Sequence, residues 1–169
     1  MGLLDKLFKS NQGPADDKPQ SRAVKGTQSR ATKPAASHEL PPNVVMLNGG
    51  GRVEVVGESQ YEDAFTRICG PRCREGYDLT VVAQLVSEPE SPYDPDAIRV
   101  EVQGLHVGYL ARPAAKAFKP VAEELASRGL TGACLGTVRG GWERGKDTGG
   151  YGIALDLAAP DKAIRPIDR

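Results

Sequence analysis

Long apolar runs are missing from the 169-residue sequence: none approaches about 18 residues, so no membrane-spanning helix is expected. The first residues also lack the basic stretch, long apolar stretch and small-residue cleavage site of a secretory signal peptide. There are only three cysteines, an odd number that argues against a disulfide scaffold. We therefore expect a cytoplasmic protein.

Signatures of catalysis are missing as well. The sequence has no phosphate-binding loop, no His-Glu-x-x-His pattern and only two histidines, His38 and His106. The pair Cys69-Gly-Pro-Arg-Cys73 lacks the second pair of ligands that a structural zinc ion requires, so free thiols are favoured over a metal site or a redox pair. We predict a protein that is not an enzyme and needs no cofactor or metal, with Cys69 and Cys73 as the only candidate metal ligands.

The sequence carries no net charge, with 22 basic and 22 acidic residues, but the charges are unevenly distributed. Residues 1–43 hold seven basic and four acidic side chains, whereas the remaining 126 residues hold 15 basic and 18 acidic ones. Residues 10–37 contain almost nothing large and apolar, and such a segment buries too little surface to offset its ordering entropy. We predict a disordered basic tail at 1–43, a folded domain at 44–158 and a C-terminal tail at 159–169.

The start of the tail is an exception, because four apolar residues lie at helical spacing within residues 2–9: Leu3, Leu4, Leu7 and Phe8. This stripe has two interpretations, a docking peptide for a partner protein or a membrane surface, and a frayed terminus that binds nothing.

Alternating apolar residues predict about six short strands in the folded domain. Gln103-Gly104 is typical of a tight hairpin between two of them, and a longer glycine-rich loop, residues 140–150, joins the last two. The predicted strands are Val53–Val55, Leu79–Val86, Ile98–Val102, Leu105–Leu110, Ala133–Val138 and Tyr151–Leu157.

Two helices are predicted between the strands. Ser59 and Glu62 form a capping-box pattern at the start of the first, which should end at Gly70. The second follows Pro113 and ends near Gly129, and Pro120 is expected to kink or divide it. The order of strand, helix, three strands, helix and two strands predicts a mainly β, α+β fold: a small, partly open antiparallel barrel of OB-like or SH3-like character.

Three connections carry candidate binding residues. The first lies between two strong strands, where Pro92 and Pro95 stiffen a turn that presents Tyr93 and Asp94, and Asp94 and Asp96 are suited to Asx turns. An aromatic ring and a carboxylate in such a turn are able to stack on a ring and accept a hydroxyl hydrogen bond, although the segment also makes sense as a plain turn.

The second connection is the Gly57-Glu58-Ser59 turn, which leads into a helix N-terminus able to bind phosphate, although a capping role explains Ser59 equally well. The third is the 140–150 loop, where Trp142 lies among basic residues. An aromatic ring beside basic groups suits single-stranded nucleic acid, and the alternative is that Trp142 packs on its own hairpin.

Together these pieces resemble a HIRAN domain over about residues 53–157. The resemblance rests on Val55-Val-Gly-Glu-Ser59 with Tyr61, on Pro92-Tyr-Asp-x-x-Ala-Ile98, on Val107-Gly-Tyr-Leu110 and on Gly140-Gly141. It implies an OB-like barrel with two helices that captures the free 3′ end of single-stranded DNA, in DNA repair or the processing of replication forks.

The resemblance also implies roles for individual residues. Tyr93 would stack on the terminal base and Asp94 would accept the 3′-hydroxyl, with Tyr61 and the Gly57–Ser59 turn near the terminal nucleotides. Tyr109 stands where the end-binding eukaryotic domain has a histidine. Asp96 stands where asparagine is common, and its carboxylate would repel phosphate if it faced the pocket.

Other functions remain open from the sequence. One alternative is a protein-interaction adaptor that docks through the Leu3, Leu4, Leu7 and Phe8 stripe, and another is an accessory to a separately encoded helicase or nuclease. Helicase motifs and RING cysteine pairs are absent from the sequence, so ATP hydrolysis and zinc binding are not expected.

Overall fold

The computed structural model describes residues 40–164. The predicted basic tail up to residue 39, including the apolar stripe of Leu3, Leu4, Leu7 and Phe8, lies outside the described residues, as do residues 165–169. Within the described part no helix is long and apolar enough to cross a membrane. The elements in chain order are β1 (Val44–Met46), β2 (Arg52–Val56), η1 (Glu58–Tyr61), α1 (Glu62–Cys69), β3 (Tyr77–Ser87), β4 (Ile98–Val102), β5 (Leu105–Leu110), α2 (Arg112–Ser127), β6 (Thr131–Gly140), β7 (Glu143–Arg144), β8 (Asp147–Thr148), β9 (Tyr151–Asp156) and α3 (Pro160–Ala163).

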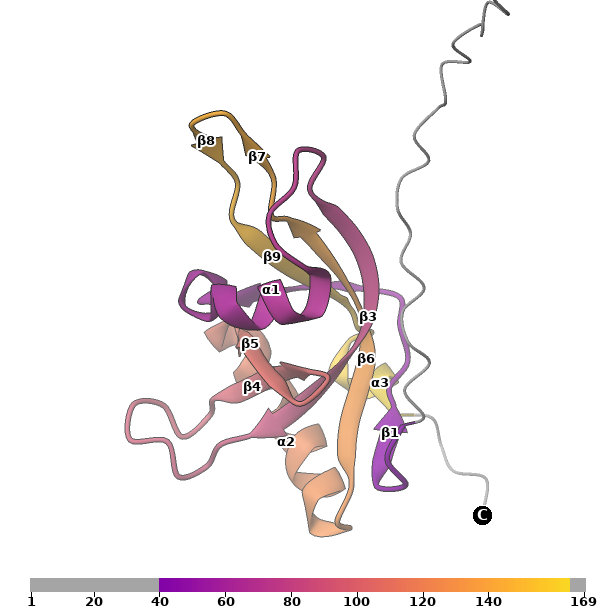
Figure 1. Ribbon diagram of the computed structural model, residues 1–169. Helices are drawn as coiled ribbons and strands as arrows, with labels where there is room; N and C mark the ends of the chain where they lie inside the picture. Colours follow the sequence, from indigo (N-terminus) through magenta and orange to yellow (C-terminus); the bar gives the residue numbers. More distant parts are fainter. Residues whose placement is uncertain (1–39, 165–169) are drawn as a thin grey trace, which may run out of the picture. The chain divides into compact units, whose positions relative to one another are not determined.

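Six strands form a closed antiparallel barrel in the order β6-β3-β4-β5-β2-β9, and pairing between β9 and β6 completes the ring (Figure 1). These are the six strands that the alternation predicts, so the predicted barrel is confirmed. The expectation of a partly open barrel is wrong, because β6 and β9 pair continuously from Leu135↔Asp156 to Gly140↔Tyr151. The β2–β5 seam is much shorter, with only Val55↔Leu110 and Val56↔Tyr109 in register.

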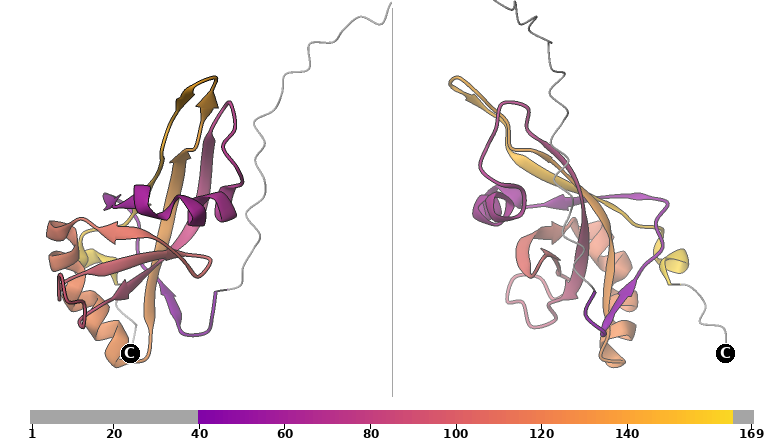
Figure 2. Two further views of the ribbon diagram at one scale, coloured as in Figure 1. Left: turned by 60° about the vertical axis from the view of Figure 1, so that its left-hand side comes forward. Right: turned by 45° about the vertical axis from the view of Figure 1, so that its right-hand side comes forward.

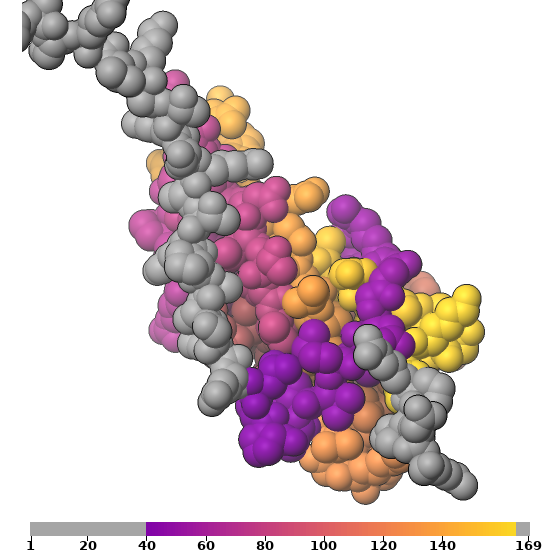
Figure 3. All heavy atoms as spheres, turned by 90° about the vertical axis from the view of Figure 1, so that its right-hand side faces the viewer, coloured from indigo at the N-terminus to yellow at the C-terminus, as the bar shows by residue number. Residues whose placement is uncertain are grey.

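Two short elements extend the barrel beyond the sequence prediction. Strand β1 pairs in parallel with the start of β6, and the Asn48 amide donates to the Ala163 carbonyl at 2.8 Å. Ala163 in α3 is fully buried, so packed structure continues past residue 158. Figure 3 shows the β1 segment and the C-terminal segment on one face of the molecule, and β1 lies along β6.

The first helix starts differently from the prediction. Ser59 lies inside η1, a 3-10 turn, and α1 begins after Tyr61 without any side-chain cap. The capping box is therefore wrong; its Glu62 carboxylate binds Arg72 instead, at 2.6 Å. The predicted end at Gly70 is confirmed, since the Gly70 amide donates to the Thr66 carbonyl at 2.9 Å.

The second helix, α2, is a single element of 16 residues. The expected division at Pro120 does not occur, and Pro120 lies on the exposed side, where water can hydrate the carbonyl that lost its donor. Gly129, with φ +70°, follows the helix as predicted.

The core fills the barrel and the space beneath both helices. Phe65 of α1 is completely buried and stacks on Tyr151 of β9 with ring centroids 5.4 Å apart. Ala115, Phe118 and Leu125 are the buried residues of α2. Figure 2 shows α1 on the side of the barrel that bears the β7–β8 hairpin, whereas α2 lies at the other end, near the loop between β3 and β4.

Candidate functional site

The β3–β4 connection, residues 88–97, is a rigid turn held by its own hydrogen bonds. The Glu88 amide donates to the Ala97 carbonyl at 3.0 Å, and the Ala97 amide donates to the Asp94 carbonyl at 3.1 Å. The Asp94 side chain forms the predicted Asx turn, since its Oδ1 accepts the Asp96 amide at 3.0 Å. One oxygen of Asp94 is thus used by the turn, and the other, Oδ2, lies 3.5 Å from Arg112 Nε.

The turn presents an aromatic ring to solvent beside a more sheltered carboxylate. Tyr93 is 92% exposed, while the Asp94 side chain is 27% exposed. A pocket of about 520 Å³ is lined by Tyr93 and by Tyr109 of β5, whereas Asp94 is not among its lining residues. Its volume is in the range of small-ligand sites, about 300–1,000 Å³. The remaining lining residues belong to the end of β3 and to the turn: Ser87, Glu88, Pro89, Glu90, Ser91, Pro92 and Tyr93.

Tyr109 is fixed in the pocket wall by a charged neighbour. Its hydroxyl donates to Glu88 Oε2 at 3.3 Å, and Glu88 Oε1 accepts from Arg99 at 2.8 Å. Burial, followed by the nearby Glu88 carboxylate, raises the pKa of Tyr109 to about 12. Tyr109 therefore remains a neutral phenol at physiological pH, with its ring along one wall of the pocket.

His106 joins Tyr61 to this wall. Its ring lies 4.0 Å from the Tyr61 ring and meets Tyr109 edge-on at 4.7 Å, between centroids. Burial lowers the pKa of His106, although the hydrogen bond to the Gly108 carbonyl opposes this, so the ring is neutral at pH 7. The structure thus brings Tyr61 of η1 next to Tyr109, as a row of rings on the outside of the barrel.

The Gly57–Ser59 turn precedes Tyr61. Gly57 adopts φ +84°, and its carbonyl accepts the Gln60 amide at 3.1 Å. The Ser59 side chain is exposed and makes no capping bond. Its contact with a terminal nucleotide stays a prediction.

Helix α2 contributes basic residues that the sequence reading did not single out. Arg112 Nε lies 3.5 Å from Asp94 Oδ2, and Lys119 Nζ lies 2.5 Å from Asp96 Oδ1. Lys116 also acts on Asp96, whose pKa is lowered chiefly by the Lys119 hydrogen bond. In the sequence, the helical spacing of Arg112, Lys116 and Lys119 already indicates a basic helix face. That this face lies against the turn depends on how α2 packs.

Trp142 is not part of this pocket. It is half-buried at the base of the β7–β8 hairpin, with the Arg144 guanidinium 5.2 Å from its ring centroid. A side chain at Gly149 would collide with the indole, so the ring packs closely on its own hairpin. Figures 1 and 2 show this hairpin on the opposite side of α1 from the 88–97 turn.

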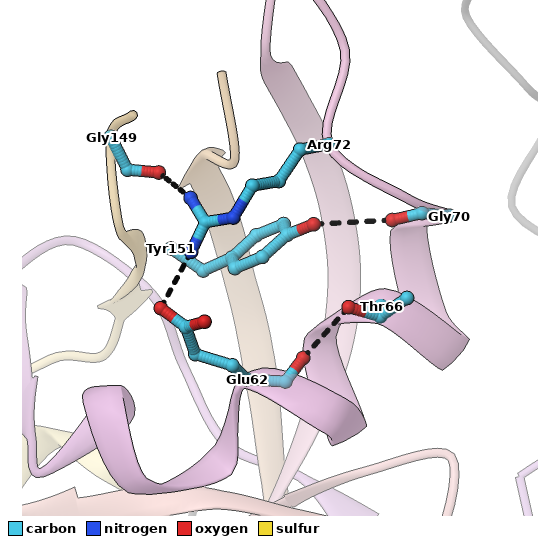
Figure 4. A network of polar contacts seen from close by, with 6 residues as sticks. All are labelled: Glu62, Thr66, Gly70, Arg72, Gly149 and Tyr151. Carbon is cyan, nitrogen blue, oxygen red and sulfur yellow. Dashed lines mark hydrogen bonds and ion pairs between the residues drawn. The ribbon is translucent and has the colours of Figure 1, made fainter. Parts of the chain in front are cut away.

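The hairpin is fastened to α1 by Arg72 (Figure 4). The guanidinium binds Glu62 at 2.6 Å and the Gly149 carbonyl, and its carbon lies 5.3 Å from the centroid of the Tyr151 ring. The Tyr151 hydroxyl in turn donates to the Gly70 carbonyl at 3.2 Å. Trp142 is therefore held in a second, separate region of the surface.

The three cysteines differ in their surroundings. Burial raises the pKa of Cys69 to about 11, whereas the half-buried Cys73 donates to the Gly76 carbonyl at 3.5 Å. Cys134 is buried in the core. Among residues 40–164 no group of three or more His, Cys, Asp or Glu side chains is arranged to hold a metal ion.

The comparison with family models identifies one family. The family model described as "HIRAN domain" matches residues 44–134, so β1 is inside the match and β9 outside it. Among solved structures, the chain is similar to the crystal structure of the HIRAN domain of human HLTF, with 20% identity, a TM-score of 0.35 and coverage of 64% of this chain and 76% of that chain. No curated protein sequence matches the chain.

Proposed function

Because the chain belongs to the HIRAN domain family, whose members are nucleic-acid-binding modules, we propose that it captures the 3′ end of single-stranded DNA at the 88–97 turn. The observation that carries the proposal is that one turn holds an almost fully exposed Tyr93, which lines an open pocket, next to a more sheltered Asp94 carboxylate. A role in DNA repair or replication-fork processing follows from the same proposal.

The terminal base stacks on Tyr93, and the 3′-hydroxyl donates to Asp94 Oδ2. Stacking on an aromatic side chain contributes about 1–3 kcal/mol per base, independently of sequence. A hydrogen bond to a charged acceptor contributes about 1.5–3 kcal/mol. These terms support capture of one strand end without extensive contact to a duplex.

Charge supports discrimination between strand ends. The pocket wall carries Glu88 and Glu90, and Asp94 directly follows the lining residue Tyr93 in the chain. A 3′-phosphate would bring like charge against these carboxylates, whereas a 3′-hydroxyl offers a donor. Arg112 is 86% exposed and only loosely paired with Asp94, so it is available to a phosphate further along the strand.

The test is fluorescence anisotropy with the full chain and a short 5′-labelled single strand that ends in a 3′-hydroxyl or a 3′-phosphate. The hydroxyl end should bind more tightly. Asp94→Asn should weaken that binding about tenfold to hundredfold, because asparagine keeps the Asx turn but not the charge. Tyr93→Ala should weaken it about fivefold or more, and Tyr93→Phe should retain it.

Asp156→Asn is the matched control, because Asp156 Oδ1 also accepts a backbone amide, that of Gly50 at 2.7 Å, on another part of the barrel. It should bind as the unmodified protein does. The proposal fails if the two strand ends bind alike, or if Asp94→Asn behaves like Asp156→Asn.

A further inference from the structure

Asp96 and Asp94 belong to the same turn. The Asp96 amide donates to Asp94 Oδ1 at 3.0 Å, so the two carboxylates are carried by one rigid unit. The anionic strand that Asp94 is proposed to receive would therefore approach a second negative charge. Left unpaired, that charge would oppose binding.

Lys119 meets this second carboxylate. Its Nζ lies 2.5 Å from Asp96 Oδ1 and 3.9 Å from Glu123, so Asp96 is its nearer partner. The Lys119 and Asp96 side chains are 28% and 34% exposed, which shelters the pair in part from solvent. The hydrogen bond between the two side chains raises the pKa of Lys119 and lowers the pKa of Asp96. Both side chains are therefore charged at neutral pH.

We infer that Lys119 is a positioning residue for the strand-end site: by neutralising Asp96 it allows the turn that carries Tyr93 and Asp94 to accept an anionic strand. This inference rests on the proposed function. It gives the two aspartates of the turn different roles. Asp94, paired with the exposed Arg112 at 3.5 Å, receives the strand end, whereas Asp96 is neutralised by Lys119 at 2.5 Å.

Charge compensation and simple anchoring of the turn predict opposite effects of Asp96→Asn on strand binding. If Lys119 cancels charge, Asp96→Asn should bind the 3′-hydroxyl strand at least as tightly as the unmodified protein. If the ion pair only anchors the turn, Asp96→Asn should weaken binding as Lys119→Met does.

The experiment measures strand binding for the full chain, Lys119→Met, Lys119→Arg, Asp96→Asn and the double variant. Lys119→Met should weaken binding on the order of tenfold, because the unpaired Asp96 charge then repels the strand phosphates in a partly screened setting. Lys119→Arg should preserve binding, and the double variant should recover it. The loss should shrink as salt is raised.

Arg128→Met is the matched control, because it breaks another α2 ion pair, with Glu124 at 2.7 Å, at the far end of the helix. It should leave binding unchanged. If the unmodified protein does not bind strand ends, the proposed function and this inference fall together. If it binds and either Lys119→Met equals it or the double variant stays as weak as Lys119→Met, only the inference is overturned.

Discussion

Gly108 lies where β5 approaches β2 closely, and replacing it with alanine should disrupt the short pairing between these two strands. Its φ is +153°, a conformation that side chains rarely adopt. A Cβ there would lie 2.6 Å from Val55 Cγ1 and 2.8 Å from the Val56 carbonyl oxygen. The second contact is with backbone, which no rotamer change relieves.

The magnitude follows from two contributions. Backbone strain at such a position costs about 1–3 kcal/mol, and overpacking against neighbouring atoms costs about 1–3 kcal/mol. Alanine recovers about 0.4–1 kcal/mol through the unfolded chain. Gly108→Ala should therefore lower the free energy of unfolding by about 3 kcal/mol, since only Val55↔Leu110 and Val56↔Tyr109 pair across this seam.

Gly104→Ala is the matched control. Gly104 also has a positive φ, +75°, but no atom lies within 4 Å of the position of its added Cβ. Strain alone then applies, and the net loss should be about 1 kcal/mol or less. Both glycines lie on the β4–β5 hairpin, so they share the local context and differ in the close approach of β2.

The assay is urea unfolding at equilibrium, followed by Trp142 fluorescence and by circular dichroism to test for two-state behaviour. For a domain of this size, about 3 kcal/mol corresponds to a fall in melting temperature on the order of 10 °C. The reasoning is refuted if Gly108→Ala is no less stable than Gly104→Ala. In that case β2 would not approach β5 as closely as described.

Two further predictions concern the titration of Tyr109 and the reactivity of the cysteines. Burial, followed by Glu88, raises the pKa of Tyr109 to about 12. The neutral phenol therefore stabilises the fold fully below about pH 10, and this contribution is lost as the pH rises toward 12. Glu88→Gln should lower this pKa without restoring the ordinary value, in an ultraviolet difference titration against Tyr109→Phe; an unchanged pKa would contradict the role of Glu88. Burial raises the pKa of Cys69 to about 11 and that of Cys134 to about 12, with Asp156 adding to the effect at Cys134. Iodoacetamide at about pH 8 should therefore modify the half-buried Cys73 first. Peptide mass mapping measures the order, and equal rates at Cys73 and Cys134 would refute it.

Local pattern was sufficient for most of the barrel and for part of the site. Period-2 alternation located all six barrel strands, because one face of each strand packs into the core. The Gln103-Gly104 hairpin was also predictable from the sequence, since both residues adopt the positive φ that such a turn requires, +53° and +75°. The Asx turn at Asp94 likewise depends only on residues two apart.

Elsewhere a local pattern was misleading, because a distant residue changed the outcome. Ser59 and Glu62 matched a capping box, but Arg72 takes the Glu62 carboxylate and a 3-10 turn precedes the helix. Strand β1 has only three residues and depends on β6, about 87 positions later, for its pairing. Trp142 stood among basic residues in the sequence, but its position follows from how the hairpin packs on α1.

By itself the sequence determined the separation of charge between its first 43 residues and the rest, the order of the six barrel strands with α1 and α2, and the turn that bears Tyr93 and Asp94. Tertiary structure decided that the barrel closes between β6 and β9, that Tyr61, His106 and Tyr109 form one row, and that Lys119 pairs with Asp96. The physical reason is range. Periodicity, caps and turns depend on residues a few positions apart, whereas closure, ring contacts and ion pairs between elements depend on where the whole chain packs.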